Sequence, residues 1–271
     1  MNPADLHQSL AGISHVIHCA GATRARNNTE FYEVNQQGTR NVVEAVNANA
    51  AVQRLVHISS LAASGPSSPG RPRREEDAPQ PVSEYGKSKL AGELEVQNSC
   101  RPDYVILRPP AVYGPRDVEF LRLFKAVKNH LCPKPCPRQE LSLVFVLDLA
   151  RCAVNCLDSR AVSRKTFFVA CEEMLNAGLM AQEIASLMRT WTLPLPLPIF
   201  VLWLVCLGQQ SQTWLTGKPN ILGLQKFAEL RAPGWTCGSS RLEAETGSRC
   251  PTRFREGAAQ TLAWYREQHW L

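Results

Sequence analysis

The chain has 271 residues, of which 44% are hydrophobic and 20% charged, and its formal net charge is +6. This composition is ordinary for a globular enzyme, and the length allows one large domain or a main domain with a smaller lobe. The densest basic cluster, at residues 71–74, is followed directly by three acidic residues at 75–77, which indicates a solvated loop and argues against nucleic acid as a partner.

Apolar segments that end in glycine, serine or proline predict buried strands in the first part of the chain. These segments are residues 15–21, 54–60 and 104–110. Residues 29–50 lie between the first two segments, and their apolar side chains recur at near-helical spacing. A loop rich in Pro, Gly and Ser at 65–81 precedes another helix, for which Ser83 is the expected N-cap.

Beyond residue 115 the pattern loosens. Residues 141–150 predict a strand that runs into a helix capped by Asp148, and residues 165–170 predict a further strand. From residue 176 on, the chain is mainly helical with proline-rich breaks, and it ends in an amphipathic helix. Strands that alternate with helices and are apolar throughout predict a parallel sheet covered on both faces.

We therefore predict an α/β protein built on a doubly wound parallel sheet. Residues 1–170 would form the domain with this sheet, and residues 171–271 a smaller, mainly helical lobe. The longest apolar run, at 195–207, is broken by prolines and too short to span a bilayer, so we expect no transmembrane segment. Two interpretations of this run stay open: a buried helix, or a helix that lines an apolar pocket or contacts a membrane surface.

Ten cysteines are a high count, and the N-terminus has no basic-then-apolar leader. We therefore expect reduced thiols and a cytoplasmic protein. Cys132 and Cys136 share a C-x3-C spacing with Cys152 and Cys156. The second pair falls in an apolar helical pattern, where cysteine behaves as a small hydrophobe, and a proline lies beside each cysteine of the first pair. These features predict no metal site.

Tyr85 and Lys89 form a Y-x-x-x-K pair, which a helix places on one face, one turn apart. A tyrosine phenol has a pKa near 10, and a nearby ammonium group lowers that pKa toward the range useful for acid–base catalysis. Ser60, at the end of an adjacent strand, would hydrogen-bond the substrate oxygen. The pair alone occurs by chance in many helices, but here Asn35, Ser60 and Tyr85 follow one another at equal spacings of 25 residues.

Five blocks of sequence together resemble the extended short-chain dehydrogenases/reductases of the NAD-dependent epimerase/dehydratase group. They are HVIHCAG, VNQQGTRNVVEA, RLVHISSLAASG, SEYGKSKLAGE and VILRPPAVYGPRD. The group includes sugar-nucleotide epimerases, dihydroflavonol-type reductases and 3β-hydroxysteroid-dehydrogenase-like proteins. The resemblance covers residues 5–170 and continues more weakly to the end, where GWTCGSSRLEAETG and REGAAQTLAWYRE look like the group's C-terminal lobe.

The resemblance implies that residues 1–170 form a Rossmann-like NAD(P)-binding and catalytic domain and residues 171–271 a substrate-binding lobe. It also implies a catalytic set of Ser60, Tyr85 and Lys89. Tyr85 would be the acid/base, and Lys89 would lower its pKa and bind the nicotinamide ribose. Ser60, assisted by Ser59, would orient the reacting oxygen. Asn35 looks like the group's helix asparagine near the site.

Four further residues are implied at the cofactor. Ala20 and Gly21 would let the cofactor pass close to the backbone, because glycine has no side chain. Pro110 and Val112 would flank the nicotinamide, although Pro110 as a simple strand terminator is an alternative.

The group's G-x-x-G-x-x-G phosphate loop has no counterpart in this sequence. In the group, this loop lies on a first strand ahead of the HVIHCAG block, and the pyrophosphate sits at the N-terminus of the helix that follows. We therefore expect an N-terminally incomplete sheet that lacks the first βαβ portion and binds its cofactor weakly.

The sequence thus predicts an NAD(P)-dependent oxidoreductase or epimerase/dehydratase that moves a hydride to or from a hydroxyl-bearing carbon, with NAD or NADP as cofactor. The apolar segment at 194–208 favours a hydrophobic substrate of the steroid or flavonol type over a nucleotide sugar. The alternative is a non-catalytic relative that serves as a binding or assembly module. A small-molecule substrate is the expected partner, with a homodimer through the helices around Asn35 and Tyr85.

Overall fold

The computed structural model describes residues 3–134, 139–196, 198–216 and 224–271. Its main sheet holds four parallel strands in the order β1-β2-β3-β7: β1 (His15–His18), β2 (Arg54–Ile58), β3 (Asp103–Arg108) and β7 (Lys165–Phe168). The strands fall within the four apolar segments that the sequence singled out. β2 and β3 are buried on both faces, which explains why their sequences are apolar without alternation.

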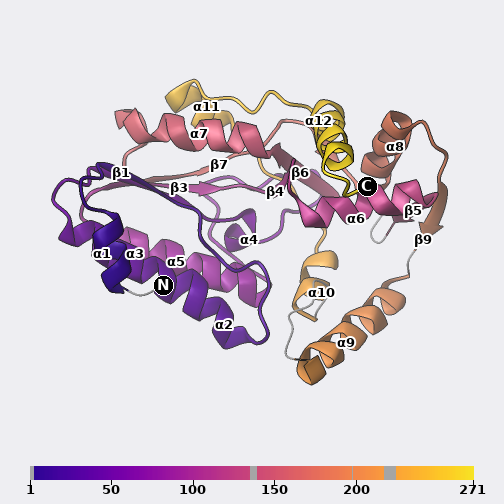
Figure 1. Ribbon diagram of the computed structural model, residues 1–271, viewed down its shortest axis with the longest axis horizontal. Coiled ribbons are helices and arrows are strands. Elements are labelled where there is room, and N and C mark those ends of the chain that lie inside the picture. The colour runs from indigo at the N-terminus through magenta and orange to yellow at the C-terminus, as the bar shows by residue number, and fades with distance from the viewer. Residues whose placement is uncertain (1–2, 135–138, 197, 217–223) are drawn as a thin grey trace.

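Helices cover both faces of this sheet (Figure 1). On one face, α3 (Gly38–Ala48) and α5 (Glu84–Ser99) pack against Leu55 and Ile106, and α1 (Pro3–Ser9) lies beside α3. On the other face, α7 (Val146–Asp158) and α11 (Ser240–Thr246) cover Val56, Val105 and Leu107. The predicted doubly wound α/β arrangement is therefore confirmed.

The helix predicted at 29–50 contains an irregular turn. α2 (Asn28–Tyr32) continues into a π-helical segment (Glu33–Gln37) and then into α3. The Asn27 side chain caps its start by accepting a hydrogen bond from the Glu30 amide, at 2.9 Å. The wider π turn carries Asn35, which lies buried beneath the carboxyl end of β1.

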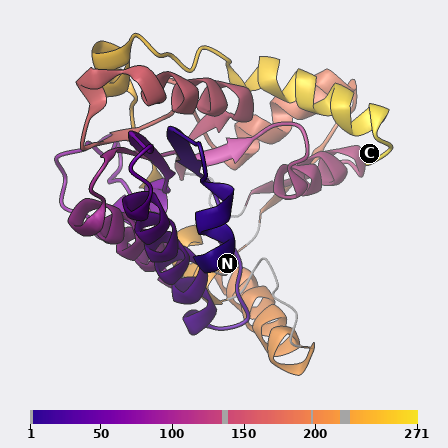
Figure 2. The ribbon, with the colours of Figure 1, turned by 60° about the vertical axis from the view of Figure 1, so that its left-hand side comes forward.

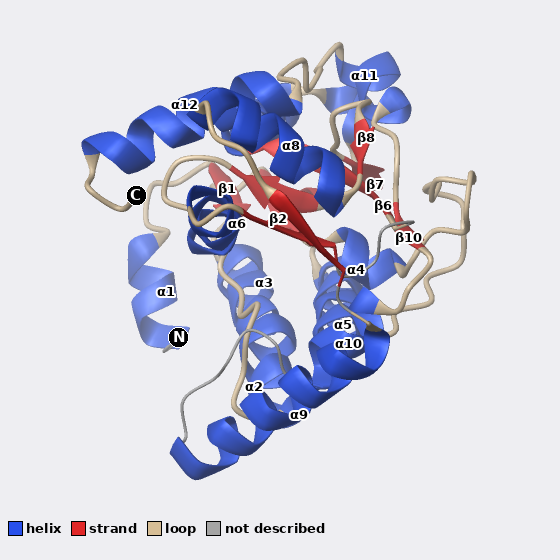
Figure 3. Ribbon diagram, turned by 90° about the vertical axis from the view of Figure 1, so that its right-hand side faces the viewer, coloured by secondary structure: helices blue, strands red, loops and turns tan. Residues whose placement is uncertain are grey.

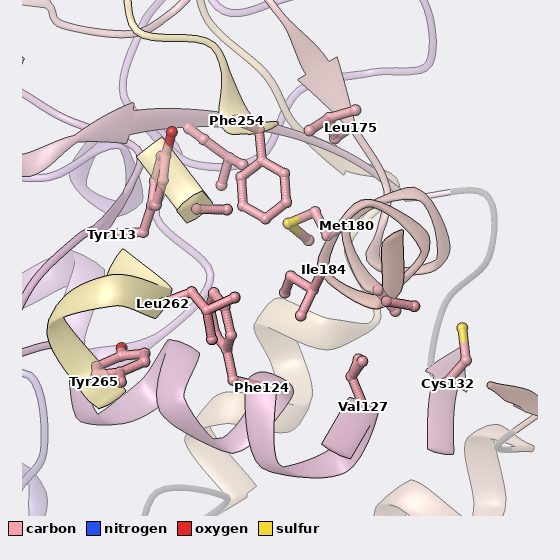
Figure 4. Close-up of a cluster of buried hydrophobic side chains, with 14 of the residues drawn as sticks. Tyr113, Phe124, Val127, Cys132, Leu175, Met180, Ile184, Phe254, Leu262 and Tyr265 are labelled. Atoms are coloured by element: carbon pink, nitrogen blue, oxygen red, sulfur yellow. The ribbon is translucent and has the colours of Figure 1, made fainter. Parts of the chain in front are cut away.

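A second, smaller sheet lies beyond β3. It contains β4 (Ala111–Tyr113), β6 (Glu140–Phe145) and β10 (Gly234–Trp235) in the order β10-β6-β4, with β8 (Met174–Leu175) antiparallel to β6. Helices α6 (Val118–Lys128), α8 (Ala177–Met188) and α12 (Phe254–Glu267) pack around its core (Figure 4). Phe124, Ile184 and Phe254 come from these three helices and meet in that core.

The packing does not follow the expected boundary at residue 170. Tyr113 and Phe145, from the first part of the chain, belong to the core of the second sheet. Leu242, from the second part, packs against the main sheet through α11. The chain passes between the two cores because β4 and β6, from the first part of the sequence, pair with each other outside the main sheet. β10, from the second part, then pairs with β6.

Strand β5 (Leu131–Lys134) lies beside α6 and α8 and pairs in parallel with β9 (Leu193–Pro196). Helix α9 (Ile199–Thr216) follows and packs against α10 (Leu224–Leu230), and both helices lie below the two cores in Figure 1. Of the two interpretations of residues 195–207, a fully buried helix is wrong, because Phe200 is 63% exposed. In the part of the chain that the structure describes, no helix is both long and apolar enough to cross a bilayer.

The structure describes three of the four cysteines in the two C-x3-C pairs. Cys152 and Cys156 are buried on α7, as the apolar pattern predicted, and Cys132 is buried on β5. Cys136 lies outside the described residues. Within the residues described, no three His, Cys, Asp or Glu side chains are grouped so as to hold a metal ion.

Candidate active site

The carboxyl ends of β1, β2 and β3 meet at one edge of the main sheet, where open α/β sheets bind their ligands. A pocket of about 180 Å³ lies at this edge. Its lining consists of Cys19, Gly21, Ala22, Thr23, Ile58, Ser59, Ser60, Tyr85, Lys89, Pro109, Pro110 and Val112. Apart from Ala20 and Asn35, every site residue predicted from the sequence contributes to this lining.

Ser60 and Tyr85 both line the pocket, and the Ser60 side chain lies close enough to act on the pKa of the Tyr85 phenol. Ser60 is the N-cap of the short helix α4 (Leu61–Ser64), and its hydroxyl oxygen accepts from the Ala62 amide at 3.1 Å. Tyr85 lies in the first turn of α5, whose N-cap is Ser83 as predicted. A Cβ at Gly86 would lie 2.4 Å from the Ala62 carbonyl oxygen, so glycine there lets α5 begin directly against α4.

Burial raises the pKa of Tyr85 above its ordinary value, and the Ser60 side chain lowers it again in part. This differs from the expectation that Lys89 lowers the Tyr85 pKa. The Lys89 ammonium instead donates to the Ile58 carbonyl oxygen at 2.8 Å. In the protein alone, the tyrosine is therefore a protonated acid at neutral pH.

Lys89 is 5% exposed, and burial lowers its pKa to about 8, against the opposing charge of Glu93. Glu93 lies one helical turn further along α5 and is fully buried. Its carboxylate accepts a hydrogen bond from Ser59 and two from Arg108. The sequence analysis did not identify Glu93 or Arg108 as site residues. Glu93 follows Lys89 by four residues, as Lys89 follows Tyr85, so the three side chains lie along one face of the helix.

Asn35 lies behind the pocket wall and does not line it. Its side-chain oxygen accepts a hydrogen bond from the Ala22 amide nitrogen at 2.8 Å, and its side-chain nitrogen donates one to the Ala22 carbonyl oxygen at 3.0 Å. It also donates to the Ser88 hydroxyl at 2.9 Å. A Cβ at Gly21 would lie 3.1 Å from the Asn35 amide oxygen and 3.5 Å from the Lys89 nitrogen. The asparagine thus shapes the loop after β1, whereas Ala20 is exposed beside it.

Two buried histidines lie beneath Lys89. The His18 and His57 rings are 5.1 Å apart, and His18 Nε2 is 3.0 Å from the Thr39 hydroxyl. Neither ring nitrogen of His57 has a hydrogen-bond partner among the described residues. Burial, and then the Lys89 charge, lowers the pKa of His18 to about 4 and that of His57 well below its ordinary value. Both imidazoles are therefore neutral at pH 7.

The C-terminal part of the chain also reaches the site. Glu229 on α10 accepts from the Ser83 hydroxyl at 2.8 Å and from the Lys226 ammonium at 2.7 Å. The two charges act on Tyr85 in opposite directions, because Glu229 raises its pKa and Lys226 lowers it. Figure 3 shows α10 beside α4 and α5.

The model of the NAD dependent epimerase/dehydratase family matches residues 1–170. The chain belongs to this family. Its members are enzymes that work on their substrates with a nicotinamide cofactor, and the chain is therefore an enzyme of the NAD(P)-dependent type. The resemblance inferred from the five sequence blocks is confirmed.

Curated relatives cover different shares of the chain. The ceramide reductase of Caulobacter vibrioides (strain NA1000 / CB15N) is 32% identical over an alignment of 281 positions that covers 99% of this chain and 79% of that protein. The UDP-glucose 4-epimerase of Vibrio cholerae is 28% identical over 71% of this chain and 63% of its own length. The human sterol-4-alpha-carboxylate 3-dehydrogenase (decarboxylating) is 34% identical over 46% of this chain. The chain thus spans less than two thirds of the epimerase and only 35% of the sterol enzyme.

Solved structures share the fold at low identity. MoeE5 in complex with UDP-glucose and NAD has a TM-score of 0.77 at 21% identity, over 98% of this chain and 83% of its own. The Bordetella bronchiseptica enzyme WbmG in complex with NAD and UDP has a TM-score of 0.75 at 20% identity, over 98% and 78%. These likenesses confirm the Rossmann-like fold class.

Proposed function

We propose that the enzyme reduces the ketone of a hydrophobic, lipid-like substrate with NADH or NADPH, or oxidises the matching alcohol, with Tyr85 as the acid/base. The observation that carries this proposal is the meeting of Ser60, Tyr85 and the buried Lys89 in one pocket at the carboxyl edge of the sheet. The ceramide reductase that aligns with 99% of the chain supports the lipid-like substrate.

The pocket suits the nicotinamide end of the cofactor. One wall is apolar, with Pro110 and Val112, and the other carries the Lys89 ammonium and the Tyr85 hydroxyl. Gly21 leaves room for close passage along the loop after β1. Lys89 and Tyr85 would hold the ribose, and Pro110 and Val112 would flank the nicotinamide ring. The bound cofactor supplies the hydride, and the protein supplies orientation and the proton.

The chain's own residues then act on the substrate oxygen. Ser60 donates a hydrogen bond that holds this oxygen beside the Tyr85 hydroxyl. Tyr85 donates its proton to the oxygen as the carbonyl carbon is reduced. Because burial keeps the Tyr85 phenol protonated, the proton-donating form that reduction requires is the one present at neutral pH. The Lys89 ammonium stabilises the phenolate that remains.

The test is hydride transfer by the purified chain, followed as the loss of cofactor absorbance with NADH and NADPH in separate reactions. The substrates are a long-chain keto-lipid in detergent micelles and, for comparison, UDP-glucose with the oxidised cofactor, whose epimerisation is followed by chromatography of the UDP-sugars because it consumes no cofactor. We expect turnover of the keto-lipid alone, and a loss of about a hundredfold or more in Tyr85→Phe, as for a lost acid/base.

The matched control is Tyr32→Phe, because Tyr32 lies near α5 and donates only to Glu84 among the contacts described for its hydroxyl. Near-normal turnover in Tyr85→Phe would refute the catalytic assignment. Turnover of the UDP-sugar instead of the lipid would refute the substrate class. A stable fold without hydride transfer to either substrate would favour a non-catalytic binding module.

A further inference from the structure

Exposed apolar side chains are concentrated on one stretch of the chain, residues 191–205, which we call the 191–205 surface. Trp191 and Leu193 are 66% and 61% exposed, and Phe200, Trp203 and Leu204 on α9 are exposed as well. In Figures 1 and 2, α9 projects away from the rest of the molecule. Exposed apolar side chains gathered on one segment of the chain mark an interaction site more often than scattered ones do.

The sequence of α9 explains why its outer face is apolar. Leu202 and Cys206, one turn apart, are buried against the molecule, whereas Phe200, Trp203 and Leu204 are exposed. A helix on the surface of a globular protein normally carries polar residues on the face opposite its core contacts. The first two turns of α9 are apolar on both faces, so their outer face lacks the side chains that suit contact with water.

The charged residues that neighbour this surface along the chain are mostly basic. Between Glu183 and Glu229 the sequence contains no acidic residue, and the exposed Arg189 lies just before the surface. Leu131 on β5 pairs with Leu193 on β9, and residues 120–134 leading into and through β5 contain four Arg or Lys and no acid. Glu183 and Glu229, which bound the acid-free stretch, are themselves paired with Arg255 and Lys226.

From these observations we propose that the 191–205 surface docks on an anionic phospholipid membrane. Aromatic rings such as Trp191, Phe200 and Trp203 favour the boundary between headgroups and acyl chains, and basic neighbours attract anionic headgroups. In this arrangement α9 would lie in the plane of the interface, with its apolar outer face toward the acyl chains.

Docking at this surface would place the site near a membrane-borne substrate. α9 packs against α10, and Glu229 on α10 accepts a hydrogen bond from Ser83, two residues before Tyr85. The membrane-contacting helix is therefore coupled through α10 to the first turn of the catalytic helix. This substrate-delivery part rests on the proposed lipid-like substrate, whereas the docking itself does not.

The test is flotation of the full chain with two vesicle populations, phosphatidylcholine alone and phosphatidylcholine mixed with phosphatidylglycerol. We expect binding to the mixed vesicles to exceed binding to the neutral ones by about tenfold and to weaken with added salt. The double variant Phe200→Glu/Trp203→Glu should lose this binding. The control Val154→Glu changes a residue of α7 that is equally exposed and apolar, and it should bind as the parent does.

Sedimentation equilibrium separates the membrane from a second copy of the chain as the occupant. A parent dimer that the double variant disperses, together with no flotation, would overturn the proposal, as would equal flotation of the parent and the double variant. Turnover of the micellar keto-lipid is measured on the same samples. Vesicle binding without any turnover would leave the docking standing and refute the proposed function, whereas turnover without vesicle binding would refute the docking alone.

Discussion

Arg108 donates two hydrogen bonds to the Glu93 carboxylate, from Nε to Oε1 at 2.9 Å and from Nη2 to Oε2 at 2.6 Å, and both side chains are buried. The same carboxylate accepts from Ser59, the neighbour of Ser60, and opposes the lowering of the Lys89 pKa. A single ion pair thus connects the end of β2, the end of β3 and the catalytic helix, and it fixes the distance between the serine and the lysine of the site.

Glu93→Gln should destabilise the protein by about 3–5 kcal/mol, because it leaves the Arg108 guanidinium buried without its counter-charge. Urea unfolding measures the change. Removing both charges, in Glu93→Gln/Arg108→Gln, should recover part of the loss, since no uncompensated charge remains. Additive losses in the double variant would show that the two side chains do not stabilise one another.

Lys89→Ala should weaken the binding of NADH and NADPH by about tenfold or more, because it removes the ammonium group that faces the proposed ribose position. Fluorescence titration of each cofactor measures the effect. Lys87→Ala is the matched control, since Lys87 lies on the same helix but is exposed and pairs with Glu84. Equal cofactor affinity in the two variants would contradict the role of Lys89.

Stability should fall as the pH is lowered from about 6.5 to about 4. The folded protein keeps His18 and His57 neutral, because their pKa values are lowered, to about 4 for His18. The unfolded chain takes up protons near pH 6.5, so acid favours unfolding, with a full loss of about 3 kcal/mol from His18 alone. The measurement is the urea midpoint at each pH.

His57→Phe isolates one of these two groups. It removes a titrating ring whose nitrogens have no partner in the part of the chain described, so the urea midpoint should depend less on pH between 4 and 6.5, with no loss of stability at pH 7. His7→Phe, on the exposed face of α1, should leave the pH dependence as in the parent. The same pH dependence in His57→Phe and the parent would exclude a folding-linked histidine at this position.

Gly86→Ala should destabilise the protein by about 1–3 kcal/mol and reduce turnover, because its Cβ would lie 2.4 Å from the Ala62 carbonyl oxygen and push α5 away from α4. The shift would also separate Tyr85 from Ser60. Gly208→Ala on α9 is the control, since a Cβ there meets nothing within 4 Å. Thermal unfolding and turnover are measured together, and a fully active, stable Gly86→Ala protein would contradict the tight contact.

The sequence predicted the main sheet and the meeting of Ser60, Tyr85 and Lys89 because each depends on a local pattern. The strands are continuous apolar runs, and the proposed catalytic residues stand at fixed positions next to them. The second sheet escaped prediction because β8 and β10 have only two residues each and show no periodicity.

Other features depend on contacts between distant parts of the chain. Glu93 and Arg108 are individually typical of solvated surfaces, and only the packing of α5 on the main sheet reveals that they are buried together. The raised pKa of Tyr85 likewise arises first from its burial, which no spacing of residues along the chain encodes.

A π turn holds one residue more than an α-helix would use along the same path. Asn35 occupies such a turn and reaches Ala22 from it. Deleting Gln36 or Gln37 would let the backbone return to regular α geometry, yet it would rotate Asn35 by about 100° relative to α3 and turn its amide away from the loop. A single-residue deletion here would therefore preserve the helix but remove the contact of Asn35 with the loop after β1. Among functional descendants of this protein, insertions and deletions between residues 28 and 48 should therefore be rarer than substitutions.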